Sequence, residues 1–413
     1  MTDELKRLIR EFETELAIIK GRVDGLEARV GELEANQFST TTKLNGLATF
    51  VVGANRFLGT ADRVRKNSNA DFGGTVFNYD LQLGLETSFS GRDQLTTVLR
   101  ASNLGDASVF GSGGPSSLTV LDAAYEAEAG SDFVGIDKLF YTFPLGDSIT
   151  MTVGPLVGQE DMLAVWPSVY PSEPILDLFP LNGAPGAYNK NKGAGVGISW
   201  STPGGLHASA NYVSANAAFS NPSQGGFATD ESAGTGTLQL GWQNEEWRLA
   251  LIYSKIQNGH DLIAYATPFT QQNLNRHGVT HAFGFGGSWS PDDSGWIPSV
   301  SAGWGFNSSD SDHRTEVQSS QSWTLALNWS DVLIAGNNAG LAVGQPVFAT
   351  DLQGNESPAD GQFIWEGWYQ FQLTDNISIT PAVFYLSRPM GELTPEGSTF
   401  QQLGGLIKTT FVF

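Results

Sequence analysis

The last eleven residues of the chain, 403–413, constrain its fold more than any other stretch. Alternate residues differ in kind there, because Ile407 and Phe411 share one parity while Lys408 lies on the other. A period of two predicts a strand with one apolar face, since successive side chains leave opposite faces. The chain stops on a further aromatic residue, Phe413. Such a last strand is typical of a transmembrane β-barrel, in which it pairs with the first strand and leaves no open edge in lipid.

The composition agrees with a barrel that lies in outer-membrane lipid. No run of eighteen or more uncharged apolar residues occurs, so no transmembrane helix is predicted. Gly (49) and the aromatic residues (Phe 25, Trp 11, Tyr 10) are abundant, as crowded strands and interfacial belts require. The absence of cysteine excludes disulfides, cysteine-based metal sites and thiol nucleophiles. A net charge of −21 argues against nucleic acid as a partner and favours cations instead.

Residues 4–37 show a period of 3.5, which predicts a coiled-coil helix. Opposite charges at flanking positions, such as Glu15 and Lys20, favour parallel chains. An amphipathic helix that lies on its own domain is the alternative, and the mixed core leaves two or three helices per bundle open. We divide the chain into a periplasmic coiled-coil helix at 1–40 and a barrel at 41–413. The predicted oligomerisation residues are Leu5, Ile9, Phe12, Leu16, Ile19, Val23, Leu26, Val30 and Leu33.

Residues 41–413 contain sixteen segments of alternating polarity. The predicted fold is therefore all-β, a transmembrane barrel of sixteen antiparallel strands. In the segment around Trp323, Leu325 and Leu327, for example, apolar side chains occupy one parity. The strands are predicted at 42–54, 76–89, 93–103, 135–144, 147–155, 193–202, 205–215, 234–244, 247–256, 278–290, 296–307, 318–329, 340–346, 361–373, 376–387 and 401–413.

The connections between these segments alternate in length. Short turns such as 90–92 alternate with long stretches such as 55–75 and 104–134. Bacterial barrels have short periplasmic turns and long outer loops, so this alternation supports the barrel. The stretch 329–339 is an exception, because it is long on the short side. Residues 118–128 also look like a strand, and we assign them to an extracellular hairpin, since an odd strand number would put the termini on opposite sides.

A barrel of sixteen strands leaves an aqueous lumen, so passage depends on what narrows it. The longest loop, 156–192, follows the fifth strand and is predicted to fold inward with Glu160, Asp161 and Asp177. Acids on this loop opposite bases on the wall would create a transverse field that orders water and favours small ions. A lumen that these charges merely solvate is the alternative. The wall residues predicted to face the loop are Arg100, Lys138, Arg248 and Lys408, with Glu366 as an acidic exception.

Three stretches resemble one known family. They are residues 14–46, which include GRVDGLEAR, residues 137–147 (DKLFYTFPLGD) and residues 340–346 (GLAVGQP). All three resemble the cyanobacterial outer-membrane porins, a group similar to the carbohydrate-selective (OprB-like) porins and often called iron-uptake porins. The resemblance covers essentially the whole chain. It implies a signal peptide and an S-layer homology domain before the coiled coil, so we expect both to precede residue 1 and peptidoglycan to be bound only through that domain.

No catalytic chemistry, cofactor or metal site is predicted, because the five histidines are scattered and neither G-x-S-x-G nor H-E-x-x-H occurs. We predict a passive diffusion channel for small hydrophilic solutes and inorganic ions, and no enzyme. A structural tether between the outer membrane and peptidoglycan, or a sugar-selective channel, is the alternative. We further predict a homotrimer with one parallel coiled coil below the pores, and Phe411 and Phe413 as a signal for the barrel-assembly machinery.

Overall fold

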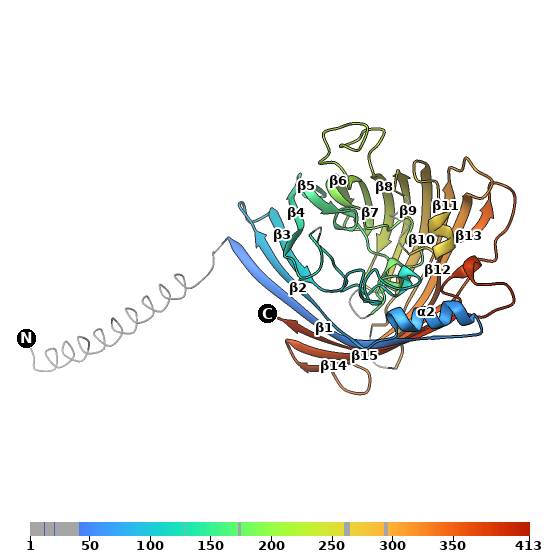
Figure 1. The fold of residues 1–413 in the computed structure, drawn as a ribbon. Coiled ribbons are helices and arrows are strands. Elements are labelled where there is room, and N and C mark those ends of the chain that lie inside the picture. Colours follow the sequence, from blue (N-terminus) through green and yellow to red (C-terminus); the bar gives the residue numbers. More distant parts are fainter. Residues whose placement is uncertain are drawn as a thin grey trace, which may run out of the picture.

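The computed structural model describes residues 12, 20, 41–127, 129–171, 175–259, 265–292 and 296–413. Within these residues sixteen antiparallel strands close into one barrel, each paired with its neighbours in sequence and β1 paired with β16 (Figure 1). The predicted sixteen-stranded barrel is confirmed. The strands are β1 (Thr42–Leu58), β2 (Val76–Thr87), β3 (Gln94–Ser102), β4 (Gly135–Pro144), β5 (Ile149–Gly158), β6 (Lys192–Ser201), β7 (Leu206–Ser214), β8 (Gly234–Gln243), β9 (Trp247–Gln257), β10 (Val279–Trp289), β11 (Ser299–Ser309), β12 (Val317–Ser330), β13 (Asn338–Leu352), β14 (Ile364–Thr374), β15 (Ile377–Leu386) and β16 (Gln401–Val412).

Within the described part of 41–413, helical structure lies in the connections between strands. The helix α2 (Asp62–Phe72) follows β1, and the short helix α3 (Pro268–Gln272) precedes β10. No helix among the described residues is long and apolar enough to cross a bilayer. The loop predicted at 55–75 was partly wrong, because β1 runs on to Leu58 and α2 occupies most of the remainder.

The barrel closes through the strand with which the chain ends. β16 pairs with β1 over twelve residue pairs, from Leu47 with Val412 to Leu58 with Gln401. Beyond the last pair, Phe413 N–H donates to the Gly46 carbonyl at 3.0 Å. Closure pairs the backbone groups of the first and last strands, which a bilayer requires because it offers no water to bond them. The predicted parity holds, because Ile407 is exposed on the outer face while Lys408 is buried on the inner face.

The end of β13 and the segment at 118–128 also differ from the prediction. β13 extends six residues past the predicted 340–346, so the following loop is shorter than expected. The extracellular hairpin predicted at 118–128 was wrong for the residues described there. They form the end of the 3₁₀ turn η1 (Ser117–Thr119) and two isolated bridges, one from Leu121 to Leu176 of the loop after β5 and one from Ala127 to Gly130. Leu121 is buried inside the barrel, so its apolar side chain explains why this segment folds inward.

The predicted coiled coil falls mostly outside the described residues. Phe12 is described, and its side chain is exposed. The helix at 1–40 and the number of helices that it joins therefore stay predictions. The core residues that lie outside the described part are Leu5, Ile9, Leu16, Ile19, Val23, Leu26, Val30 and Leu33.

The apolar core of the protein lies inside the barrel, where loops pack against the inner wall. One cluster joins residues of the loops after β3 and β5, including Phe110, Leu121 and Leu176, to Trp368 and Phe384 on β14 and β15. These loops are visible within the barrel in Figure 1. Burial of such side chains stabilises the loops in place, by roughly 1.5–3 kcal/mol for each large apolar side chain.

A second cluster packs the later part of the loop after β5 against β9, β10 and β13. It joins Leu181 and Tyr188 to Ile252 of β9 and Val347 of β13. The two clusters thus hold parts of the loops after β3 and β5 inside the barrel. The aqueous path is therefore limited to the space that the loops leave open.

Glycines on β11 allow the loop after β5 to approach the wall this closely. A Cβ atom added to Gly303 would lie 1.8 Å from the carbonyl oxygen of Asn182. On the loop side, Gly183 has a φ of +76°, which residues with a side chain rarely adopt. The backbones of wall and loop are thus in direct contact, and no larger residue fits between them.

Replacing Gly303 with valine should therefore push the loop away from the wall. We expect Gly303→Val to lower the free energy of unfolding by about 1–3 kcal/mol, the usual effect of overpacking. The matched control is Gly367→Val, because the nearest atom to a Cβ at Gly367 is 3.8 Å away. Urea unfolding in lipid vesicles would measure both variants. Equal stability of the two would contradict the role given to Gly303.

Candidate functional site

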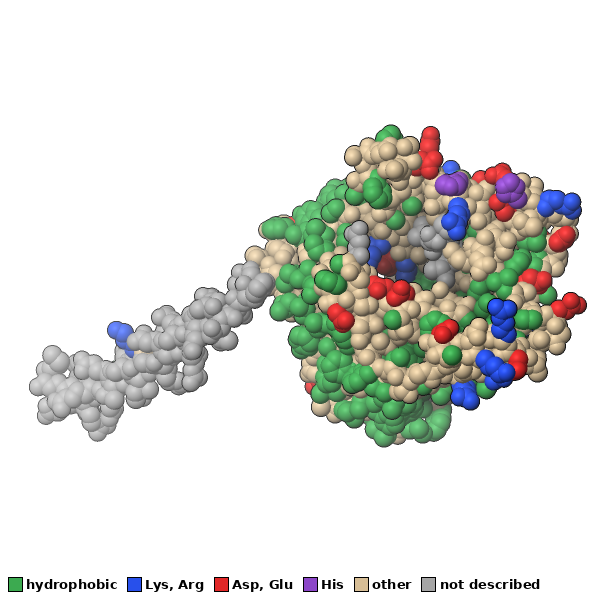
Figure 2. All heavy atoms as spheres, in the orientation of Figure 1, with side chains coloured by type: hydrophobic (Ala, Val, Ile, Leu, Met, Phe, Trp, Pro, Cys, Tyr) green, Lys and Arg blue, Asp and Glu red, His purple; other side chains and the backbone are tan. Residues whose placement is uncertain are grey.

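A cavity of about 820 Å³ lies in the lumen where the loops leave the wall free. Its wall side is formed by β1 to β4, β6, β9 and β16, and its other side by the loops after β3 and β5. Figure 2 shows a hollow at the centre of the barrel with basic and acidic side chains inside it. We call this space the eyelet. Its charged lining residues are Arg100, Asp122, Asp137, Lys138, Glu160, Asp177, Lys190, Lys192, Arg248 and Lys408.

A second cavity, of about 780 Å³, lies on the outer wall over β5 to β11. Its lining includes Ile198, Leu238 and Phe283, which point away from the lumen and are exposed. No charged side chain lines it among the described residues. An apolar surface of this kind faces the hydrocarbon of the bilayer, so the eyelet is the better candidate for solute passage.

A β-bulge on β4 brings two charged side chains to the eyelet from adjacent positions. Lys138 pairs with Val98 and Ile136 pairs with Leu99, so Asp137 is one extra residue on β4. A bulge breaks the alternation of faces and re-aims a side chain. Asp137 and Lys138 can therefore both line the eyelet, although a regular strand would send one of them to the lipid.

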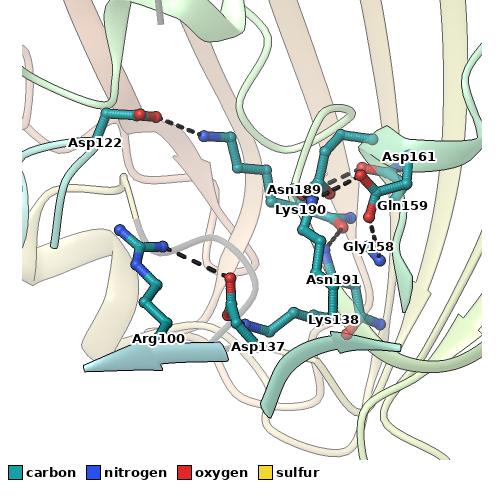
Figure 3. A network of polar contacts seen from close by, with 12 residues as sticks. Arg100, Asp122, Asp137, Lys138, Gly158, Gln159, Asp161, Asn189, Lys190 and Asn191 are labelled. Atoms are coloured by element: carbon teal, nitrogen blue, oxygen red, sulfur yellow. Dashed lines mark hydrogen bonds and ion pairs between the residues drawn. The ribbon is translucent and has the colours of Figure 1, made fainter. Parts of the chain in front are cut away.

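Asp137 is the centre of a first group of charges, shown in Figure 3. Its carboxylate lies 3.7 Å from the guanidinium of Arg100, which also binds Asp80 of β2 at 2.7 Å. The ammonium of Lys192, at the start of β6, pairs with the other oxygen of Asp137. The ring of Tyr125 lies 5.1 Å from the Arg100 guanidinium, within the range of a cation–π contact. These groups fix one another in place.

Lys138 holds the beginning of the inward loop. Its ammonium lies 2.6 Å from Asp161 and 3.3 Å from Glu160, both in the 3₁₀ turn η2 (Glu160–Met162). Asp161 also accepts a hydrogen bond from the Gly158 N–H at 2.9 Å. The acids of the loop and the base of the wall thus touch directly. They neutralise each other at this point and do not face each other across a gap.

Lys190 holds the end of the same loop. Its ammonium lies 2.6 Å from Asp177 and 3.3 Å from Asp122, which belongs to the loop after β3 (Figure 3). Asp177 also accepts a hydrogen bond from the hydroxyl of Tyr265. Burial and the neighbouring Asp122 raise the pKa of Asp177 to about 7. Burial alone would lower the pKa of Lys190, but the two carboxylates raise it above its usual value.

Comparison with known proteins agrees with this architecture. Residues 2–413 match the family described as "Carbohydrate-selective porin, OprB family". This chain belongs to the OprB family of porins. It is 31% identical to an uncharacterized protein of Nostoc sp. (strain PCC 7120), over 99% of this chain and 72% of the relative. The family and the fold make it an outer-membrane channel for small solutes, and they favour this function over a purely structural tether.

Two solved porins share the fold at low sequence identity. OprB of Pseudomonas putida has a TM-score of 0.60 and 11% identity, with 90% of this chain and 94% of that chain covered. OmpT of Vibrio cholerae has a TM-score of 0.53 and 6% identity, with 90% and 100% covered. At these identities the likeness concerns the fold alone.

Most of the predicted pore residues lie at the eyelet of this porin. Asp161 does not line it but pairs with Lys138, which does. Glu366 is 2% exposed and lies beneath the loop, where it accepts hydrogen bonds from the Tyr170 hydroxyl and the Leu176 N–H, both at 2.7 Å. It therefore clamps the loop to β14. The predicted residues that line the eyelet are Arg100, Lys138, Glu160, Asp177, Arg248 and Lys408.

Sequence reasoning missed the partners that complete these ion pairs. Asp137 was overlooked because parity assigns only one of two adjacent residues to the lumen, and Asp122 because its segment was placed outside. Lys190 and Lys192 directly precede a predicted strand. Two bases at the end of the inward loop could have indicated partners for the acids of that loop. The missed residues are Asp80, Asp122, Asp137, Lys190 and Lys192.

The charges at the eyelet are balanced. Of the described residues, six basic and four acidic side chains line it. Two more acids pair with lining bases without lining the eyelet themselves, Asp80 with Arg100 and Asp161 with Lys138. They bring the number of acids to six. The eyelet thus differs from the chain as a whole, whose net charge is −21. In the described part of the chain no group of three or more His, Cys, Asp or Glu side chains could hold a metal ion.

The raised pKa of Asp177 should make the ion selectivity of the eyelet depend on pH near neutrality. A carboxyl group is neutral below its pKa and anionic above it, so the lining gains one negative charge as the pH rises through about 7. One unit charge about 6 Å from an ion in water changes its free energy by about 0.7 kcal/mol, or roughly threefold in population.

Because the change in free energy has opposite signs for the two ions, the permeability ratio of K⁺ to Cl⁻ should be up to about tenfold higher at pH 8 than at pH 6. Zero-current potentials in a KCl gradient at about 0.1 M salt, where screening is moderate, would measure it. Asp177→Asn should remove most of this step. An equal step in the wild type and in this variant would show that another group titrates.

Proposed function

We propose that this porin lets small hydrophilic solutes and inorganic ions diffuse passively through the eyelet. The observation that supports this most is the balance of six basic and six acidic side chains around a passage inside a closed barrel. Passive flow needs hydrated walls that do not trap the solute. Paired charges supply hydrogen-bonding groups without a large net field, so neutral solutes and ions of either sign can enter.

Carbohydrates are the favoured class among the neutral solutes. The family description names carbohydrate selectivity. The eyelet itself also supports this class, because Trp166 lines it beside the charged groups and Tyr125 packs against Arg100. Aromatic faces contact the apolar faces of sugar rings, while carboxylates and ammonium groups can bond the hydroxyls.

Conductance in planar bilayers tests the channel. We expect stepwise conductance. The K⁺/Cl⁻ permeability ratio should lie within roughly threefold of unity at pH 7, because the charged side chains at the eyelet sum to less than one unit charge. Liposome swelling should show entry of monosaccharides at rates that fall steeply with sugar size. A folded protein that never conducts, or that passes only one sign of ion, would contradict this function.

We also propose that the porin is a homotrimer with its helix at 1–40 in the periplasm as a parallel coiled coil. The heptad pattern of residues 4–37 supports the helix. The Vibrio cholerae neighbour is described in a trimer form, which supports the number three. The Nostoc relative supports a cyanobacterial source. Phe411 and Phe413, on the closing strand, are proposed as the signal for the barrel-assembly machinery, and peptidoglycan as a partner only through a preceding domain.

Mass measurement in mild detergent tests the trimer. We expect three copies of the 44.2 kDa chain per particle. A variant that lacks residues 1–37 should keep its conductance, because these residues lie outside the barrel region. If the barrel walls set the stoichiometry, the shortened variant stays trimeric. Monodisperse monomers or dimers of both the intact and the shortened chain would refute the trimer.

A further inference from the structure

The loops after β3 and β5 are joined to each other inside the barrel. Leu121 and Leu176 form an antiparallel bridge, and both side chains are buried. Asp122 N–H donates to the Ile175 carbonyl, and Asp177 N–H donates to the Val120 carbonyl, both at 3.1 Å. These backbone bonds fix the junction of the two loops without help from charged side chains.

The junction brings two carboxylates together at the eyelet. Asp122 and Asp177 follow the bridged leucines directly, and their side chains are only 22% and 10% exposed. Two carboxylates so close to each other and so poorly hydrated repel each other unless a cation lies between them. Lys190 supplies that cation, with its ammonium within 3.3 Å of both.

The backbone holds Lys190 in an unusual conformation to do this. Its φ is +52°, in the left-handed region that glycine and asparagine adopt more readily than lysine. Its N–H donates to the side-chain oxygen of Gln159 at 3.2 Å. The amide of Gln159 is anchored in turn to Thr237 and Ser254 on β8 and β9. A lysine where glycine would fit more easily indicates that its side chain has a role.

We propose that Lys190 is a specificity-determining residue of this channel. Its charge balances the two carboxylates at the junction of the loops, and without it the eyelet prefers cations. This inference rests on the proposed function, because it requires ions to pass through the eyelet. The loop junction remains closed when Lys190 is replaced, since the backbone bonds and the buried leucines persist. The change is therefore one of charge and not of pore size.

Zero-current potentials in a KCl gradient at about 0.1 M salt, recorded from pH 7 to pH 10, test this inference. Loss of the ammonium raises the pKa of Asp177 further, so in Lys190→Met the K⁺/Cl⁻ permeability ratio should begin to rise at a higher pH than in the wild type. At pH 10 the ratio should exceed that of the wild type by up to about tenfold, because one unit charge acts with opposite signs on K⁺ and Cl⁻. Lys190→Arg keeps the charge and should behave like the wild type. The matched control is Lys66→Met, which removes an equal charge from α2, where Lys66 pairs only with Asp62 among the contacts described.

Asp122→Asn provides a second test with the opposite sign. It removes a negative charge at the same junction, so the permeability ratio should fall. Heat-dependent mobility in detergent gels would reveal whether Lys190→Met assembles. If it does not, Asp122→Asn alone tests the inference. The inference is overturned if both eyelet variants match the wild type, or if Lys66→Met shifts the ratio as much as Lys190→Met. A wild-type chain without any conductance would instead refute the proposed function, and this inference with it.

Discussion

The hydrogen bonds between β1 and β16 are the interaction on which the rest of the structure depends. Lipid offers no partner for backbone N–H and C=O groups, so a sheet is stable there only when its two edges meet. Pairing from Leu47–Val412 to Leu58–Gln401 meets this condition and fixes the parity of each closing strand. The outer face of these strands is then committed to lipid and the inner face to the lumen. Closure at sixteen strands also encloses a space far wider than a small solute needs.

The loops after β3 and β5 narrow this space, because they fold into the lumen. Their apolar side chains form two clusters against the wall, and their few charged groups gather at the remaining passage. Each buried charge has a partner that keeps it in place, as Glu366 does under the Tyr170 hydroxyl and the Leu176 N–H. Removing one partner of a buried charge pair lowers the free energy of unfolding by about 3–5 kcal/mol, because it leaves the other partner buried and unpaired. The geometry of the passage is thus as fixed as that of an apolar core.

The strands could be predicted from the sequence because each one obeys a local rule. Alternation decides which side chains meet lipid, and the structure follows it at Ile407 and Lys408 on β16. On the wall the site was predictable where alternation is regular, as for Arg100 on β3, and the length of the loop after β5 indicated Glu160 and Asp177. The inward path of residues 118–127 depends on contacts with Leu176, far away in the sequence, and no local pattern records them. The bulge at Asp137 likewise depends on how β4 pairs with β3, which parity alone cannot reveal.

The acidic composition of the chain and the balanced eyelet act at different places. Asp310, Asp312 and Glu356 are exposed in the loops after β11 and β13, on the side of the barrel with the long connections. Such charges raise the local concentration of cations within about 10 Å of the surface at 0.1 M salt. The eyelet lies inside the barrel and is lined by paired charges, so it responds to its own partners. Cations are thus enriched at the mouth but not held in the passage. A neutral solute feels little of the field at the mouth and meets hydrogen-bonding groups inside, so the size of the eyelet and not the net charge of the chain sets its rate of entry.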